Sequence, residues 1–334
     1  MLPDLYTMVM TPVLRAFLSW LGSSTGVWIR FEKIKGEFFN YRVCLEEVDL
    51  KISNILHIAA QKCTLEFSIL DFSFNQVVVS NLLLEGARIE YTHVSNQDLL
   101  PRSLPPFLIH QLTLKQSEVI FKESDPNKPL AFKLALDDYH CDSLHSKWLL
   151  FNAIFNSRLA GQLDGTPITL KYSEAGDKRI SHWALRGLPI KKLTPFVDGK
   201  LDLLQDSSMD LLVTNEWLPD QDEIGMNVQV WVHDLVNFKQ PKFLPAPTKA
   251  LADAMGILIN RQVKTIPLAF QFSVRKDDFM EISRIDASGM VIAFAEALSK
   301  AILDKSLQNF DQILDMGFLG LDTLLDIKNI FDKY

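Results

Sequence analysis

Apolar and polar residues alternate with a period of two from about Val27 onward, over roughly 250 residues. In the first such run, Val27, Ile29 and Phe31 fall on one side, and Arg30 and Glu32 on the other. The same period recurs in the runs Val48–Ile52, Leu82–Leu84, Ala87–Tyr91, Leu112–Leu114, Val119–Phe121, Leu130–Leu136, Ile168–Tyr172, Leu211–Val213 and Met226–Val232. Successive residues of a strand point to opposite faces, so each run predicts a strand with one apolar face. Serial strands of this kind favour an antiparallel sheet with one solvated side.

Short segments rich in Gly, Asp, Asn and Pro separate these runs and predict turns. They are Lys35-Gly36-Glu37, Glu85-Gly86, Asp125-Pro126-Asn127, Asp164-Gly165, Ala175-Gly176-Asp177 and Asp198-Gly199. The Asp-Gly pairs at 164–165 and 198–199 suit tight hairpins. A further strand pair is predicted at Ile266–Val274 and Phe279–Ala287.

Three segments have a helical rather than a strand pattern. Leu5–Leu21 is apolar but is interrupted by Pro12 and Arg15, and roughly 17 residues is the short limit for a spanning helix. It is interpreted as a helix lying in a membrane interface, the remnant of a longer anchor, or a helix that caps the fold. A second helix is predicted near 247–262. After Gly289 the apolar period changes to three and four, which predicts amphipathic helices.

The fold class predicted is mainly β: an elongated antiparallel sheet curled into an open apolar groove, with an N-terminal helix and C-terminal amphipathic helices. A sandwich or a large barrel would be other ways to bury so many apolar strand faces. The predicted parts are an N-terminal membrane-associated or capping helix over 1–24, a β-groove domain over 25–288, and a C-terminal helical segment over 289–334.

Composition narrows the function classes. Hydrophobic residues make up 48% of the 334 residues and charged residues 22%, which excludes bulk disorder. A net charge of −7 gives no global attraction to nucleic acid. The three cysteines have no CxxC spacing and are expected to be buried small hydrophobic residues.

No common catalytic, nucleotide-binding or metal-binding motif is present in the sequence. His140-Cys141 and His145, near Asp137-Asp138, are interpreted as a solvated loop rather than a metal site. The pair Glu46-Glu47 is interpreted as solvated surface, because neighbouring strand residues do not converge. The sequence therefore predicts no enzyme activity, no cofactor and no metal.

Several segments of the chain resemble the AsmA and TamB group of bacterial envelope proteins, and those up to Tyr91 resemble its N-terminal region. They are Leu14–Leu21, Ser24–Val27, Ile34–Gly36, Leu45–Leu50, Gln76–Val79, Leu82–Tyr91, Trp183–Leu193 and Gly199–Leu203. The resemblance implies an elongated β-groove with an apolar interior that holds or moves lipid between membranes, as in the broader bridge-like lipid-transfer group. It also implies a place in the periplasm of a Gram-negative-type envelope, associated with the inner membrane.

The function predicted is that of a non-enzymatic envelope protein that binds or transfers lipid through its groove and contributes to outer-membrane maintenance. The expected partners are phospholipid-like acyl chains, a membrane and other envelope proteins, but not nucleic acid. The candidate lipid-binding wall residues are Ile29, Phe31, Leu50, Leu84, Ile89, Leu114 and Phe132. The alternative is a structural or assembly factor whose sheet edges template strands of outer-membrane client proteins.

Overall fold

In the computed structural model the chain is mainly β. The structure describes residues 11–12, 27–37, 41–52, 55–67, 77–93, 106–123, 131–146, 149–175, 177–194, 204, 206–218, 221–233, 265–275, 293–294, 296–298 and 300–301. Their strands form one large, mostly antiparallel sheet that is not closed into a barrel. The mainly β prediction is therefore confirmed.

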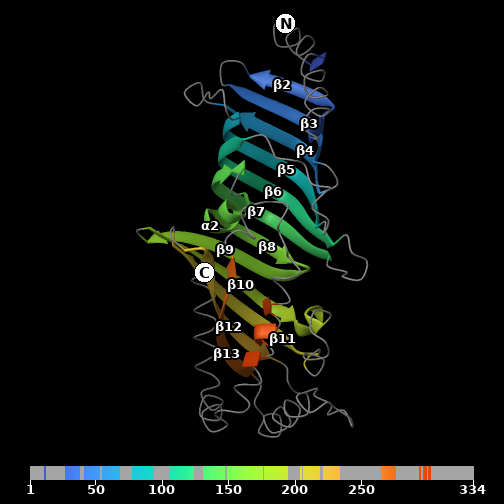
Figure 1. The fold of residues 1–334 in the computed structure, drawn as a ribbon. Coiled ribbons are helices and arrows are strands. Elements are labelled where there is room, and N and C mark those ends of the chain that lie inside the picture. Colours follow the sequence, from blue (N-terminus) through green and yellow to red (C-terminus); the bar gives the residue numbers. More distant parts are fainter. Residues whose placement is uncertain are drawn as a thin grey trace, which may run out of the picture. The chain divides into compact units, whose positions relative to one another are not determined.

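The chain divides into two compact units (Figure 1). Unit 1 comprises Met1–Gly165 and Lys276–Ile285, and unit 2 comprises Thr166–Arg275 and Asp286–Tyr334. Unit 1 contains β1 (Val27–Arg30), β2 (Lys33–Glu37), β3 (Arg42–Ile52), β4 (Leu56–Glu66), β5 (Val77–His93), β6 (Phe107–Glu123), β7 (Ala131–His145), α2 (Leu149–Phe155) and β8 (Ser157–Leu163). Unit 2 contains β9 (Thr166–Ala175), β10 (Lys178–Pro189), the 3₁₀ turn η5 (Ile190–Lys192), β11 (Ser208–Trp217), β12 (Glu223–His233) and β13 (Thr265–Arg275).

The strands of unit 1 lie side by side in chain order, with β1 and β2 both paired to β3 (Figure 1). Every neighbouring pair is antiparallel except β5 and β6, which are parallel from Val77 opposite Phe107 to His93 opposite Glu123. The prediction of a wholly antiparallel sheet is wrong at this pair. Phe107, where β6 begins, lies beside Val77, where β5 begins, and a parallel pair needs a connection of about a dozen residues or more.

One face of unit 1 has a cross-strand row of alternating charge. Lys33, Glu46, Lys62, Glu85, Lys115 and Asp138 follow one another on β2 to β7 as opposed partners. The Nζ of Lys62 lies 2.7 Å from the Oε2 of Glu85. Opposite charges on facing strands stabilise a pair, and like charges destabilise it. The row therefore favours the observed register and marks this as the solvated, polar face.

Glu85-Gly86 lies inside β5, so the predicted turn there is wrong. Gly86 has φ +62, and Glu47 on β3 and Gln116 on β6 have φ +52 and +48. A left-handed residue interrupts the pleat and bends a strand. These three strands and their neighbours β4 and β7 have buried residues three apart, on either side of two outward ones. These pairs are Leu45 and Val48, Ala60 and Cys63, Leu84 and Ala87, Leu114 and Ser117, and Leu136 and Tyr139. We call this aligned set of positions the kink line.

In unit 2, β9 to β13 pair as an antiparallel series. The strands predicted at Ile168–Tyr172, Met226–Val232 and Ile266–Val274 are confirmed as parts of β9, β12 and β13. Asp164 and Gly165 have φ +48 and +81, as the predicted Asp-Gly turn requires.

Several predicted segments lie wholly or partly outside the described residues. These include 247–262, 279–287, the turns at 125–127 and 198–199, and most of 1–24 and 289–334. Within the last two, Thr11, Pro12 and the described residues of 293–301 are helical. None of the helices in the described part of the chain has the length and apolar character needed to span a membrane.

An ion-pair cluster on the polar face makes unit 1 sensitive to acid. Glu90 accepts from Lys122 and Arg88, each at 2.7 Å, and these hydrogen bonds lower the pKa of Glu90 to about 2. An unfolded glutamate titrates near 4.3, so the stabilisation is present above that pH and is lost as pH falls toward about 2. We expect Glu90→Gln to flatten the fall in Tm between about pH 5 and 2.5. The Tm of the control variant Glu47→Gln, changed at an exposed site on β3, should fall with pH as that of the wild type does. A Tm of Glu90→Gln that falls in parallel with that of the wild type would refute the prediction.

Candidate functional site

The face of unit 1 opposite the charge row is apolar across seven strands. Its outer row consists of Ile29, Leu50, Ile58, Ile89, Val119, Leu134 and Leu163, each opposite the next on β1 and β3 to β8. All seven side chains are half-buried. The protein therefore only half covers a continuous aliphatic row, which a guest could contact.

A second row, which runs through one side of the kink line, is fully buried. It consists of Ile34, Leu45, Cys63, Leu84, Leu114, Tyr139 and Leu159 on β2 to β8. Each of these residues is at most 8% exposed. We call the two rows, together with the buried residues at the kink line and the row of Tyr91, Phe121 and Phe132, the apolar face of unit 1. Every residue of this second row is thus buried, whereas every residue of the outer row is only half-buried.

Six of the seven predicted wall residues lie on the apolar face of unit 1: Ile29, Leu50, Leu84, Ile89, Leu114 and Phe132. The seventh, Phe31, lies between β1 and β2. Phe31, Leu84 and Leu114 are 6%, 7% and 4% exposed, so the protein itself already covers them. Ile29, Leu50, Ile89 and Phe132 are half-buried and are the ones that a guest would meet first.

Period two alone assigns Leu84 and Ile89 to opposite faces of one strand. The structure places both on the same face, because the left-handed Gly86 lies between them. The same shift occurs between Leu114 and Val119 at Gln116. The sequence indicates this shift by a change in the phase of the apolar alternation within one strand, which in β5 occurs at Gly86.

One polar side chain, Ser117, is buried on this face at the kink line. Its hydroxyl accepts from the Ala87 N–H at 3.2 Å and donates to the Lys115 carbonyl at 2.9 Å. Its hydrogen bonds are used within the sheet, so Ser117 stabilises the kink and leaves the face apolar to a guest.

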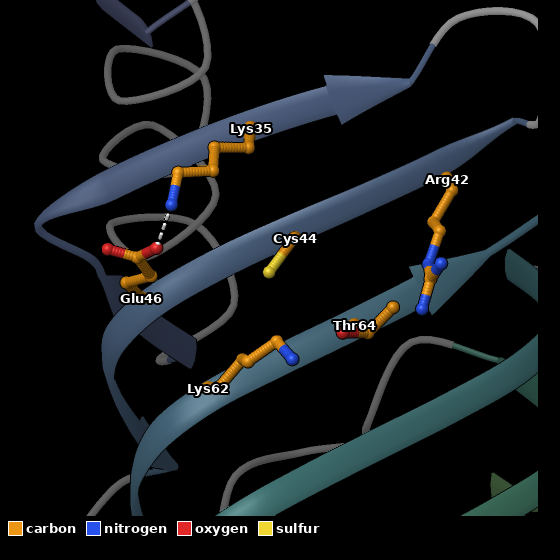
Figure 2. Close-up of a pocket in the computed structure, with 6 residues that line it drawn as sticks. All are labelled: Lys35, Arg42, Cys44, Glu46, Lys62 and Thr64. Atoms are coloured by element: carbon orange, nitrogen blue, oxygen red, sulfur yellow. Dashed lines mark hydrogen bonds and ion pairs between the residues drawn. The ribbon is translucent and has the colours of Figure 1, made fainter.

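A shallow pocket of about 250 Å³ lies on the polar face of β2 to β4 (Figure 2). It is lined by Lys35, Arg42, Cys44, Glu46, Lys62 and Thr64. The hydrogen bond between Lys35 and Glu46 raises the pKa of Lys35 and lowers that of Glu46. Arg42 and Lys62 pair with carboxylates outside the pocket, at 3.4 and 2.7 Å. Each cation of the pocket thus has a carboxylate partner, which leaves little charge to attract an anion.

The predicted solvated loop at His140-Cys141 is instead part of β7. His140 faces the polar side, where its Nε2 lies 3.0 Å from Asp142 Oδ1 and its Nδ1 lies 3.2 Å from Thr113 Oγ1. Cys141 is fully buried on the other face, with its Sγ 3.5 Å from the Asn152 carbonyl of α2. The described residues contain no group of three or more His, Cys, Asp or Glu side chains able to hold a metal ion.

The three cysteines differ in reactivity. Burial raises the pKa of Cys63 and of Cys141 to about 12, whereas Cys44 is half-buried beside the polar pocket. The thiolate is the reacting form, so at pH 8 almost none of Cys63 or Cys141 can react. We expect iodoacetamide to label one thiol per native chain, and none in Cys44→Ser. Peptide mass spectrometry identifies the labelled cysteine. In guanidinium all three thiols should be labelled. Fast labelling of Cys63 or Cys141 in the native protein would contradict the burial described.

Neither the protein-family models nor the curated proteins include one that matches this chain.

Proposed function

We propose that this protein binds lipid acyl chains along the apolar face of unit 1 and transfers or holds them, without catalysing a reaction. The observation that carries the proposal is the half-buried outer row, which offers one aliphatic side chain from each of seven strands. Removing apolar surface from water is favourable by roughly 25 cal/mol per Å², or about 0.8 kcal/mol for each buried CH₂. An acyl chain along this row would therefore bind through contacts that need no polar partner.

In this proposal the sheet is curled into an open groove, and the polar head groups stay at its opening. The polar face is suited to contact water, because its charges alternate and pair with one another. The binding is passive: hydrocarbon replaces water along the row, and release needs only a competing apolar phase such as a membrane.

The resemblance to the AsmA and TamB group extends the proposal to the cellular setting. On that basis the protein works in the periplasm of a Gram-negative-type envelope, associated with the inner membrane, and contributes to outer-membrane maintenance. Fractionation of cells that express the full chain, with markers for each compartment, tests this part separately from lipid binding.

Native mass spectrometry of the purified protein tests lipid binding directly. We expect mass increments that correspond to lipids, which organic extraction removes and which added phospholipid restores. A protein that never carries lipid, and that takes none from fluorescent phospholipid vesicles, would refute the proposal. Crosslinks to client strands at β1 or β13, the ends of the described strand order, would then favour the assembly-factor alternative.

A further inference from the structure

Unit 2 has an apolar face of its own, which the buried polar residues Ser181 and Asn215 interrupt. The inward residues of β12 and β13 are all apolar. On β11 they are Met209, Leu211, Val213, Asn215 and Trp217. Asn215 is 3% exposed, and its row across β9 to β13 reads Tyr172, Ser181, Asn215, Met226 and Phe272.

Asn215 is only partly satisfied where it is buried. Its Nδ2 donates to Ser181 Oγ at 3.1 Å, while its Oδ1 is buried with no hydrogen-bond partner. Turning the amide over would pair Oδ1 with Ser181 and leave Nδ2 unpaired instead. Either orientation leaves one buried amide atom without a partner, which proteins rarely retain without a reason.

A second unpaired group lies beside it. Trp183 is on the neighbouring strand β10, one row from Asn215 on the same face, and its Nε1–H is also buried without a partner. Diagonal neighbours of this kind are about 7–8 Å apart at their backbones, within reach of long and aromatic side chains. The face thus presents one unused donor and one unused acceptor next to an otherwise apolar surface.

We propose that Trp183 and Asn215 hydrogen-bond the polar group of an amphipathic guest whose hydrocarbon lies against the apolar face of unit 2. The inference rests on the proposed lipid-binding function and narrows its ligand class. Trp183 needs an acceptor, and with Asn215 Nδ2 bonded to Ser181 Oγ, Asn215 Oδ1 needs a donor, so in this orientation the guest's polar group does both. A hydroxyl or a secondary amide meets this requirement, whereas a simple ester only accepts.

The surroundings favour a neutral group over an ionised one. Within the same row the neighbours are Ser181 and Met226, which carry no charge. One row away, the Arg179 guanidinium lies 6.0 Å from the Trp217 ring and its Nε is 3.9 Å from a Glu174 carboxylate oxygen, so its charge is already balanced. Asn215 Oδ1 and Trp183 Nε1 are themselves buried, so the half-buried side chains of Trp183 and Met226 must shift for a guest to reach them.

We call the hydrogen bonds of Trp183 and Asn215 to the guest the anchor. Two probes of equal size distinguish the anchor from apolar contact alone. Dodecan-1-ol donates and accepts a hydrogen bond, while 1-methoxyundecane only accepts one. Both probes offer nearly the same hydrocarbon to other apolar surfaces, so the ratio of their affinities, compared between the wild type and Asn215→Leu, reports the two hydrogen bonds. Measured by displacement of a fluorescent fatty-alcohol probe from the full chain, the wild type is expected to bind the alcohol about tenfold more tightly.

The two variants should fail in different ways. Asn215→Leu should reduce the alcohol preference to within about twofold, while its affinity for the ether stays at the wild-type value. Its Tm should stay near that of the wild type, because the removal of a buried unpaired amide oxygen is offset by the loss of the hydrogen bond to Ser181 Oγ. Trp183→Phe should weaken both probes about equally, since both accept a hydrogen bond, and it keeps the test decisive if Asn215→Leu does not fold.

Equal affinity of the wild type for both probes, or an alcohol preference that survives Asn215→Leu, would overturn the anchor and leave the proposed function standing. Failure of the wild type to bind either probe would overturn both.

Discussion

Changing Ile58, Ile89 and Val119 together to glutamine is expected to reduce the lipid bound to the purified protein at least tenfold. These three residues stand next to one another in the outer row, on β4, β5 and β6, and all are half-buried. Full burial of such a side chain is worth about 1.5–3 kcal/mol, so the half that a guest would cover is worth about 1 kcal/mol each. Their combined loss exceeds the roughly 1.4 kcal/mol that corresponds to a tenfold change in affinity.

A matched pair of single substitutions distinguishes a loss of lipid contacts at the apolar face from the effect of removing any half-buried isoleucine. Ile89 and Ile120 are both half-buried isoleucines on the adjacent strands β5 and β6, but Ile120 is opposite Glu90 on the polar face. Ile89→Gln should lower the affinity for a fluorescent phospholipid several-fold, and Ile120→Gln should leave it unchanged. Melting curves of both variants provide the control for folding.

The outcome that would count against the lipid-binding face is equally specific. Equal effects of Ile89→Gln and Ile120→Gln, with both variants folded, would mean that lipid does not select the apolar face. Undiminished lipid in the triple variant would mean that the outer row is not where the acyl chains bind.

Gly161→Ala is expected to lower the free energy of unfolding by about 3 kcal/mol, the upper end of the usual cost of overpacking. A Cβ at Gly161 on β8 would lie 2.1 Å from the Ala135 carbonyl oxygen and 3.1 Å from its carbonyl carbon, both on β7. These are backbone atoms, so no side-chain rotation relieves the contact. The two strands would have to separate where their register shifts, between Leu136 and Asp138.

Gly225→Ala is the control for the loss of a strand glycine. A Cβ there would meet only the Glu216 carbonyl oxygen, at 3.9 Å, which is an ordinary contact. Removing a glycine also reduces the freedom of the unfolded chain, which favours folding by about 0.4–1 kcal/mol where the new residue fits. The free energies of unfolding of the two variants, measured in urea, should therefore differ by several kcal/mol. Overlapping unfolding curves for Gly161→Ala and Gly225→Ala would show that the backbones of β7 and β8 are not so close.

Much of the sheet could be predicted from alternation alone. Met226–Val232 and Ile266–Val274 have a clean period of two and are strands with that face inward. Glu85-Gly86 was misread as a turn because glycine next to a charged residue is typical of turns. In β5 the same glycine serves a strand that continues through it, and only the pairing with β4 and β6 reveals this.

Other features depend on contacts that no local pattern contains. The parallel pairing of β5 and β6 could not be predicted, because the alternation within one strand does not depend on the direction of its neighbour. The face of Asn215, by contrast, follows from its spacing to Leu211 and Val213, which the alternation already identified. What the sequence did not show is that the amide would remain partly unpaired where it is buried.

The outer row of the apolar face has a consequence for how a bound hydrocarbon would move. Seven strands at about 4.8 Å spacing extend about 29 Å across the sheet, close to the ~30 Å hydrocarbon thickness of a bilayer. Every strand contributes Ile, Leu or Val, so advancing a chain by one strand exchanges one aliphatic neighbour for another of nearly equal worth. The energy profile along the row is therefore almost level, and a guest would diffuse in one dimension rather than occupy a single fixed position.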